Sequence, residues 1–290
     1  MPKAKVGVIG GTGLYDIEGL TDIEEVEIDT PFGKPSDAIT IGRLEGVGVA
    51  FLPRHGKGHR ISPTEIPVRA NIYALKSLGV EHIIAICSAG SFKPEIKPGD
   101  LVIPDQLLDR TRSRVNSFFG EGIVAHISFA EPFCPVLSQI LYHAAGEVGA
   151  KVHPRGTYIT VEGPAFSTRA ESQLYRSWGA DIIGMTALPE AKLAREAELC
   201  YAIIACVSDY DCWRRQSQPV TIDVVFNVLR QSIDTAKKII TLAVTRIPEK
   251  RNCDCATALK TAIVTAPELI PEEQKKRLDL LIGKYLEGGR

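Results

Sequence analysis

One stretch, AIIACVSDYDCW at residues 202–213, constrains the fold of this chain more strongly than any other. It begins as an unbroken apolar run, which is typical of a strand buried on both faces in a parallel sheet. Its end carries two acids, Asp209 and Asp211, on either side of a tyrosine. Ligands of open α/β sheets bind beyond the carboxyl ends of the strands, so these carboxyl groups are candidates for a functional site. The alternative is that they only cap a following helix.

The two carboxyl groups have chemistry that suits catalysis. A half-buried aspartate next to a second one is expected to have a raised pKa, because desolvation and the like charge both disfavour its ionised form. Such a group can hold a proton near neutral pH. We therefore predict a general acid at this strand end.

Strands and helices alternate along the rest of the chain. Short apolar or alternating runs predict strands at residues 5–9, 38–44, 47–52, 82–86, 101–103, 157–160 and 181–183. Helical patterns lie at residues 66–78, 136–148, 169–177, 189–198 and 222–245. This order predicts an α/β fold, a single domain with a mixed, mostly parallel sheet flanked by helices. We expect the domain to cover residues 1–248, and residues 249–290 to form a tail that packs on it or on a neighbouring subunit.

The charge balance and the hydropathy exclude several classes of protein. The chain has 34 basic and 35 acidic side chains, so it offers no field that attracts nucleic acid or an anionic membrane. No apolar run approaches the roughly 20 residues of a membrane span. Gly10-Gly11 interrupts the apolar run at the start, which does not read as a signal peptide. We expect a cytoplasmic protein that binds a small molecule.

The turn Gly10-Gly11-Thr12-Gly13 follows the first predicted strand. Its glycines let backbone N–H groups converge on an anion, and Thr12 adds a hydroxyl donor. A dinucleotide fingerprint would need a third glycine at Asp16, and the Walker motif would need Gly-Lys-Ser/Thr, so both patterns fail. A phosphate site is the favoured interpretation, and a purely structural tight turn is the alternative.

Further strand ends carry hydrogen-bond donors or small residues. The sequence RHGKGHR at 54–60 sets Arg54 and His55 among glycines, and the arginine fork suits two phosphate oxygens. The alternative is a solvated basic loop. The sequence CSAGS at 87–91 lets a ligand approach the backbone closely. After the strand at 157–160, Glu162 and Phe166 are suited to receive sugar hydroxyls and a flat ring.

An ordered set of motifs resembles those of the methylthioadenosine phosphorylases, in the trimeric branch of the purine nucleoside phosphorylases. The likeness runs from Val6 to about Val244 and rests on IGGTGLYD, TPFGKPSDA, RHGKGHRI, IKPGDLVIPDQ, AEPFCP, VEGPAFSTRAES, GADIIGMT and SDYDCW. Any one motif is weak, but the ordered set is specific. The resemblance implies the nucleoside phosphorylase fold. It also implies phosphorolysis of S-methyl-5′-thioadenosine to adenine and 5-methylthio-ribose 1-phosphate, with phosphate as co-substrate and neither metal nor organic cofactor.

The resemblance further implies roles for individual residues. Phosphate would be bound by Thr12, Arg54, His55, Cys87, Ser88 and Thr186. The nucleoside would be bound by Ala89, Gly90, Phe166, Met185, Asp209 and Asp211, with His126 reaching in from an adjacent subunit. The two aspartates would be catalytic, Asp209 at purine N7 and Asp211 at the 6-amino group. Family members often have Thr-Ala or Ser-Ala where this chain has Cys87-Ser88, so which of these two groups touches phosphate stays open.

Residues 109–135 show little periodicity and are expected to cross the surface, where a neighbouring subunit can meet them. Together with the resemblance this predicts a homo-oligomer, either a trimer or a dimer of trimers. Three other functions compete with adenine nucleoside phosphorolysis. They are a dinucleotide-dependent oxidoreductase, a nucleoside-binding protein without turnover, and a phosphorylase of 6-oxopurine nucleosides such as inosine, guanosine or methylthioinosine. A hydrolytic nucleosidase is excluded only by the phosphate site.

The chain has seven cysteines and six histidines. No CxxC pair is present and the histidines are scattered, so we expect no zinc ligand set. Cys134 and Cys200 are both expected near the edge of the core, and we predict a disulfide between them. Cys253 and Cys255 would close a second, strained ring. Free thiols throughout, as in a reducing cytosol, are an equal alternative.

Overall fold

The computed structural model describes residues 4–11, 17–214 and 222–286, with side chains from residue 232 onward in the last range. The strands are β1 (Val6–Gly10), β2 (Thr21–Val26), β3 (Ile39–Leu44), β4 (Val47–Pro53), β5 (His82–Ser91), β6 (Leu101–Val102), β7 (Gln106–Arg110), β8 (Val152–His153), β9 (Thr157–Val161), β10 (Ile182–Gly184) and β11 (Cys200–Asp209). The helices are α1 (Val68–Ser77), α2 (Pro135–Glu147), α3 (Arg169–Ser177), α4 (Ala187–Glu196), α5 (Ile222–Val244), α6 (Glu272–Arg277) and α7 (Asp279–Leu286). Short 3-10 turns are η1 (Asp211–Trp213), η2 (Asp254–Thr257) and η3 (Pro267–Leu269).

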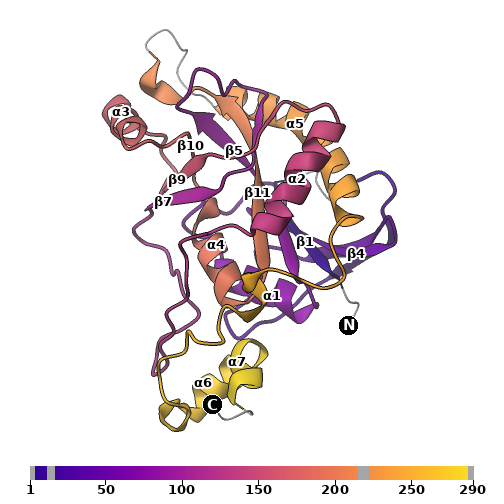
Figure 1. Ribbon diagram of the computed structural model, residues 1–290, viewed down its shortest axis with the longest axis vertical. Helices are drawn as coiled ribbons and strands as arrows, with labels where there is room; N and C mark the ends of the chain where they lie inside the picture. The colour runs from indigo at the N-terminus through magenta and orange to yellow at the C-terminus, as the bar shows by residue number, and fades with distance from the viewer. Residues whose placement is uncertain (1–3, 12–16, 215–221, 287–290) are drawn as a thin grey trace.

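The strands form one 11-stranded sheet, in which β11 and β5 lie at the centre (Figure 1). Strand β5 pairs in parallel with β1 and β11, and β1 pairs in parallel with β4. The pairs β7–β9, β9–β10 and β6–β8 are parallel as well, whereas β2–β3, β3–β4, β5–β10 and β6–β11 are antiparallel. The predicted fold class, a mixed and mostly parallel sheet flanked by helices, is confirmed.

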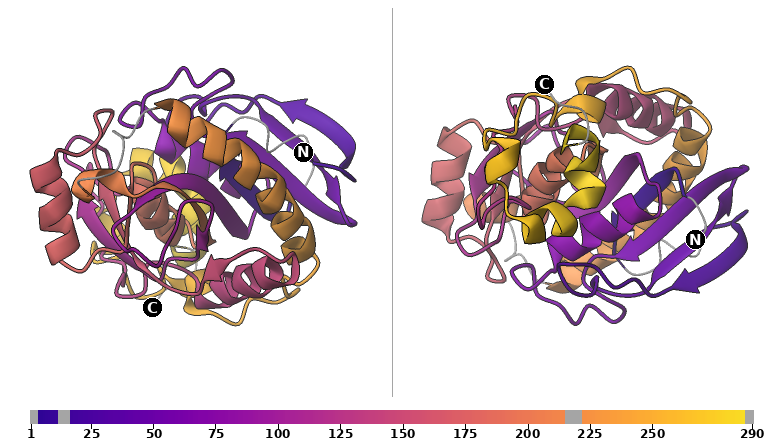
Figure 2. Two further views of the ribbon diagram at one scale, coloured as in Figure 1. Left: turned by 90° about the horizontal axis from the view of Figure 1, so that it is seen from above. Right: turned by 90° about the horizontal axis from the view of Figure 1, so that it is seen from below.

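Helices cover both faces of the central strands (Figure 2). Along β11, Ala202, Ile204 and Cys206 pack with buried residues of α2 and α5. The alternate residues Ile203 and Ala205 pack with buried residues of α1 and α4. The apolar run that begins at Ala202 is therefore a strand buried on both faces, as predicted, and its end at Asp209 is the part that can face a ligand.

Residues 111–134, between β7 and α2, are tied to the body of the chain from within. Glu196 accepts hydrogen bonds from Ser117 Oγ at 2.8 Å and from the Phe118 amide at 2.7 Å. Phe118 is buried. The excursion predicted at 109–135 thus has a buried anchor, and its first two residues are the end of strand β7, which pairs with β9 and which sequence periodicity did not indicate.

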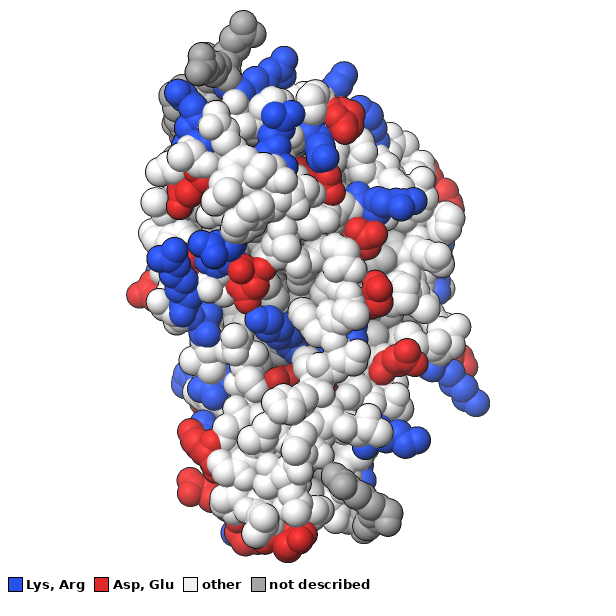
Figure 3. All heavy atoms as spheres, turned by 60° about the vertical axis from the view of Figure 1, so that its left-hand side comes forward, with Lys and Arg blue, Asp and Glu red and all other residues white. Residues whose placement is uncertain are grey.

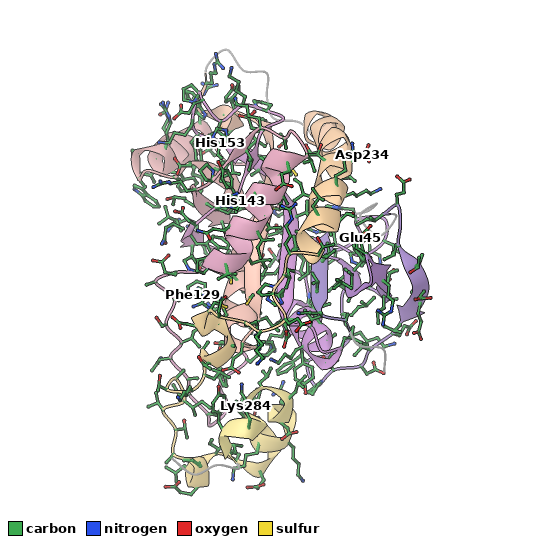
Figure 4. All side chains as sticks on the ribbon, turned by 45° about the vertical axis from the view of Figure 1, so that its right-hand side comes forward. Glu45, Phe129, His143, His153, Asp234 and Lys284 are labelled. Atoms are coloured by element: carbon green, nitrogen blue, oxygen red, sulfur yellow. The ribbon has the colours of Figure 1, made fainter. Side chains whose placement is uncertain are left out.

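The tail from residue 249 packs on the same chain. Glu198, which is buried, accepts hydrogen bonds from the Leu259 amide at 3.1 Å and the Tyr285 hydroxyl at 2.5 Å. Lys284 on α7, labelled in Figure 4, forms an ion pair with the same carboxylate. The backbone of the tail also pairs with residues 124–126, where the His126 amide donates to Ala262 O at 2.8 Å. One acid of the domain therefore holds two separate segments of the tail, the one at Leu259 and helix α7.

All seven cysteines lie in the described part of the chain and carry free thiols. Neither predicted disulfide is present, which corrects the expectation for Cys134–Cys200 and for Cys253–Cys255. The sulfur of Cys253 lies 3.7 Å from that of Cys134 and 3.4 Å from that of Cys200, so several thiols share one pocket instead of forming two bonded pairs.

Acidic and basic side chains are interspersed over the face of the molecule in Figure 3. Among the described helices, none combines the length and the apolar character needed to cross a bilayer.

Candidate active site

Parallel pairing of β4, β1, β5 and β11 places several of the predicted site residues at one edge of the sheet. Gly10 at the end of β1 pairs with Pro53 at the end of β4, and the Arg54 amide donates to Gly10 O at 2.9 Å. On the other side of β5, Ser88 pairs with Cys206 and Gly90 pairs with Asp209. The glycine turn, the arginine turn, the CSAGS segment and the acid pair thus belong to four adjacent strand ends. Thr12 lies outside the described residues.

Arg54 is held in place by a buried acid that the sequence analysis did not identify. Its Nε donates to Glu190 Oε1 at 2.5 Å and its Nη2 donates to Glu190 Oε2 at 3.1 Å. Its Nη1 donates to Ile86 O at 2.8 Å. Burial opposes the charge, but the Glu190 carboxylate raises the pKa of Arg54 above its ordinary value. The guanidinium is therefore a fixed cation, with an N–H of Nη1 left over from these bonds for a ligand oxygen.

His55 is neutral at this site. Burial, reinforced by the positive charge of Arg54, lowers the pKa of His55 to about 4. Its Nδ1 lies 2.9 Å from Ile61 O, so Nδ1 carries the hydrogen and donates it, and its ring stacks on His59 at 4.2 Å. The role predicted for His55 in binding phosphate stays a prediction, and an uncharged imidazole would fill it by hydrogen bonding and not by charge.

Cys87 and Thr186 differ in what they offer to an anion. Burial raises the pKa of Cys87 to about 11, so its thiol stays protonated and presents no negative charge. Thr186 precedes α4 without making a side-chain capping bond, and its hydroxyl lies within hydrogen-bonding reach of Tyr158. Tyr158 is fully buried, and burial beside Cys87 raises the pKa of its hydroxyl well above the ordinary value. The Cys87 thiol and the Tyr158 hydroxyl beside it are thus both protonated.

A chain of hydroxyl groups joins the CSAGS segment to the acid pair. Ser88 Oγ lies 2.9 Å from Ser208 Oγ, and Ser208 Oγ donates to Asp209 Oδ2 at 2.7 Å. The other carboxylate oxygen, Asp209 Oδ1, accepts from the Asp211 amide at 2.7 Å. Asp209 is therefore fixed in direction by two hydrogen bonds and is connected to Ser88 through one intervening side chain.

Asp211 is the more buried of the two acids, only 5% exposed. Burial raises the pKa of Asp211, and the neighbouring charge of Asp209 adds to the shift. Its backbone has a positive φ of 49°, a conformation that aspartate tolerates better than most residues. Gly90 permits the close approach, since a Cβ there would lie 2.9 Å from Asp209 Oδ1. The raised pKa predicted for the acid pair is found at Asp211.

Met185 is positioned by contacts behind it. Gly163 has a positive φ of 69°, which favours glycine, and a Cβ there would lie 2.6 Å from Met185 Sδ and displace that side chain. Arg114 donates to Met185 O and to Leu188 O, both at 2.6 Å, and to Glu162 O at 2.6 Å. One side chain of the 111–134 segment therefore braces two loops of the site.

Glu162 corrects one expectation. Its carboxylate accepts from Thr64 Oγ1 at 2.8 Å, the Ser113 amide at 3.2 Å and Arg114 Nε at 3.2 Å, as well as from the Arg112 amide. Burial opposes ionisation, but these donors lower the pKa of Glu162 to about 2. The carboxylate is already occupied in organising the segment at 112–114, so it is not free to receive sugar hydroxyls as the sequence analysis suggested.

Two of the predicted nucleoside contacts are solvent-facing. Phe166 is 45% exposed, at the turn that precedes α3. His126 is exposed and is fixed only through its backbone bond to the tail. Their roles toward a purine and a 5′ group stay predictions.

Residues 5–245 match the model of the phosphorylase superfamily, and the chain belongs to that family. It is 57% identical over 282 residues to S-methyl-5′-thioadenosine phosphorylase of Geobacter sulfurreducens, which covers 97% of this chain and 99% of the relative. It is 53% identical over 266 residues to the protein of the same name from Hyperthermus butylicus, covering 90% and 96%. The resemblance read from the motifs is confirmed.

Solved structures of methylthioadenosine phosphorylases are also similar to this chain. A methylthioadenosine phosphorylase from an Antarctic soil metagenomic library has a TM-score of 0.93 and 48% identity, covering 97% of this chain and 99% of that one. A mutant adenosine/methylthioadenosine phosphorylase of Schistosoma mansoni, solved in complex with methylthioadenosine, has a TM-score of 0.83 and 40% identity, covering 89% and 96%.

Proposed function

We propose that this chain catalyses the phosphorolysis of S-methyl-5′-thioadenosine to adenine and 5-methylthio-ribose 1-phosphate, a pentosyl transfer. The main support is that hydrogen bonds link the acid pair to the CSAGS segment at 87–91, the predicted phosphate-binding turn, at the same edge of the sheet. Asp209 is joined through Ser208 to Ser88, with hydrogen bonds of 2.7 and 2.9 Å. Cleavage of a purine nucleoside by phosphate needs both parts at once, an anion site on one side of C1′ and a proton donor at the base.

On the phosphate side, Arg54, Ser88 and Thr186 would bind the anion beside C1′, together with Thr12. The ribose gains cationic character as the bond to purine N9 breaks, and a fixed anion next to C1′ is both the nucleophile and a countercharge. Arg54 does not need to reorient for this, because Glu190 already fixes its guanidinium. The protonated Cys87 thiol adds no negative charge that would repel the phosphate, and neutral His55 would contribute a hydrogen bond but no charge.

On the base side, Asp209 would direct a proton to N7, which removes the negative charge left on the leaving purine. In the structure both carboxylate oxygens of Asp209 accept a hydrogen bond. Asp209 therefore has to receive a proton during turnover before it can pass one to N7. The hydroxyl chain from Ser88 through Ser208 is a route for that proton from the phosphate side. Met185 would lie along the ribose, and Phe166 would lie against the purine, near the backbone of Ala89 and Gly90.

A second candidate is a 6-oxopurine nucleoside phosphorylase, and one observation favours it. Ionised Asp211 accepts a hydrogen bond from a 6-amino group and repels a 6-oxo group, but burial raises the pKa of Asp211. A protonated Asp211 would donate to the 6-oxo group instead. We therefore assign the adenine nucleoside as the substrate of the ionised form of Asp211, and a 6-oxopurine nucleoside as the substrate that its protonated form would favour.

Several coarser features belong to the same proposal. Phosphate acts as co-substrate, and the reaction uses neither a metal nor an organic cofactor. The protein is cytoplasmic. Residues 1–248 form the phosphorylase domain, and residues 249–290 form a tail that, where it is described, packs on the same chain.

We also propose a homo-oligomer, a trimer or a dimer of trimers, in which His126 completes a neighbour's 5′ pocket. The support is that His126 is exposed, whereas Arg114 and Phe118 on the same segment are anchored within their own chain. Light scattering should give at least three times the 31.6 kDa of one chain. A fully active monomer would exclude this arrangement.

The proposed reaction is tested by adenine release. Purified protein is assayed with methylthioadenosine, adenosine and inosine, each with and without phosphate. We expect release that requires phosphate and prefers methylthioadenosine. Equal release without phosphate would identify a hydrolase, and a preference for inosine would favour the 6-oxopurine enzyme.

A further inference from the structure

Four cysteines that are far apart in the sequence converge on one point. They are Cys134, Cys200, Cys253 and Cys255, and their sulfur atoms all lie within 4.8 Å of one another. Cys134 stands at the N-cap of α2, and Cys200 is the first residue of β11. The other two flank the start of η2 in the tail. Three of the four residues are buried, and Cys253 is partly buried.

The spacing of the sulfur atoms is that of metal ligands. A bonded sulfur pair lies about 2.05 Å apart. A tetrahedron with a zinc–sulfur distance of about 2.3 Å instead separates its sulfur atoms by roughly 3.8 Å. The Cys253 sulfur lies 3.7 Å from that of Cys134 and 3.4 Å from that of Cys200. The pocket therefore needs only a small adjustment to close around an ion.

We propose that Cys134, Cys200, Cys253 and Cys255 bind one zinc ion as four thiolates. Soft sulfur ligands in a tetrahedral set select zinc or iron, and a closed set of four, without an open position, is typical of structural zinc. Binding exchanges the four thiol protons for one Zn²⁺ and releases those protons to solvent. No oxidant or reductant is involved.

The surroundings suit a site with net negative charge. Cys134 lies at the amino end of α2, where the helix dipole favours a thiolate. His82 is 3% exposed, and its buried Nδ1 makes no hydrogen bond to any residue that the structure describes. Metal-bound ligands commonly take a further hydrogen bond from such a group.

The position of the cluster assigns it a structural role. Cys200 and Asp209 are the two ends of β11, so the metal would lie at the end of the strand remote from the candidate active site. The metal would join α2 and β11 to the start of the tail at Cys253 and Cys255. Further along the tail, residues 262–264 pair with residues 124–126. The zinc site is thus independent of the reaction proposed above, and it fastens the tail that supports the His126 segment.

Metal analysis of the full chain tests this. Protein purified under reducing conditions should contain about one zinc per chain by mass spectrometry of the metals. Cys253→Ser and Cys255→Ser should each lose most of it and should lower the Tm. Cys206→Ser, a buried cysteine of β11 outside the cluster, is the matched control and should keep its zinc.

A second measurement keeps the test valid if a variant fails to fold. Reduced wild-type protein, stripped with a chelator, is titrated with Co²⁺ and should show one equivalent with the intense visible bands of tetrahedral thiolate coordination. The proposal is overturned if the wild type neither contains zinc nor binds Co²⁺, or if the serine variants bind metal as the wild type does. Stoichiometric iron in place of zinc would overturn the choice of metal, and two disulfides in freshly isolated protein would overturn the site.

Discussion

Arg54 and Glu190, 136 residues apart, form a two-point ion pair whose side chains are 3% and 1% exposed. Two parallel hydrogen bonds fix the plane of the guanidinium, which a single contact would leave free to turn. Tyr201 donates to the same carboxylate at 2.9 Å. The cation that the proposed reaction needs is thus held in place before any ligand arrives.

Removal of Glu190 should therefore destabilise the protein strongly. Glu190→Ala leaves a buried, unpaired guanidinium, which costs about 3–5 kcal/mol. Denaturant unfolding measures the loss. Glu147→Ala is the control, because Glu147 pairs with Arg246 at an exposed position, where the loss of an ion pair should change the free energy of unfolding far less. Equal losses in the two variants would contradict the account of Arg54.

Asp209→Asn should lower kcat for methylthioadenosine by about 100-fold or more, the scale of a lost proton donor, with a much smaller change in KM. Ser208→Ala should lower kcat by about 10-fold or more because it removes a hydrogen bond to the carboxylate, and Ser208→Thr should restore it. Steady-state kinetics with saturating phosphate separates kcat from KM. Near-normal kcat in Asp209→Asn would remove Asp209 from the mechanism.

Asp211→Asn should shift the substrate preference toward 6-oxopurines, because it replaces an acceptor by a group that can donate. In the wild type, the ratio of inosine to methylthioadenosine turnover should rise as the pH falls, because the raised pKa of Asp211 lets it become protonated. The ratio is measured from pH 8 down to about 5 at saturating phosphate. A ratio that is unchanged in the variant and across this range would exclude Asp211 from substrate selection.

The free energy of unfolding should decrease as the pH rises from weakly acidic to neutral, because of Glu196. Burial raises the pKa of Glu196 from 4.5 to about 7, against hydrogen bonds from the Phe118 amide and Ser117. The folded state then binds more protons than the unfolded state in this window. The contribution is complete below about pH 4.5 and is lost as the pH rises through about 7, on the order of 3 kcal/mol. In Glu196→Gln this slope should disappear from the unfolding free energy, and an unchanged slope would refute the assignment.

Local pattern predicted much of the fold. The run 202–209 is a buried strand, and the helix expected at 169–177 has those bounds. Strand β2 was missed because its sequence TDIEEV is exposed and carries no apolar alternation. Strand β7 was missed because its partner β9 lies about 50 residues further along the chain.

The site was predicted only in part, and the reason is distance along the chain. Motifs at strand ends located Arg54, Ser88, Asp209 and Asp211, because parallel strands bring their ends together. Glu190 was missed although it stands in an apolar context, and only its pairing with Arg54 reveals its role. The four-cysteine cluster likewise joins residues 53 and 119 positions apart, which no short motif records.

The identity of the sugar product distinguishes phosphorolysis from hydrolysis most directly. Methylthioadenosine and phosphate are incubated with the protein and followed by ³¹P NMR, while adenine is measured in the same sample. Phosphorolysis should yield one equivalent of a pentose 1-phosphate for each adenine released, with a matching loss of inorganic phosphate. Adenine that appears with free methylthioribose, and with the phosphate signal unchanged, would contradict it.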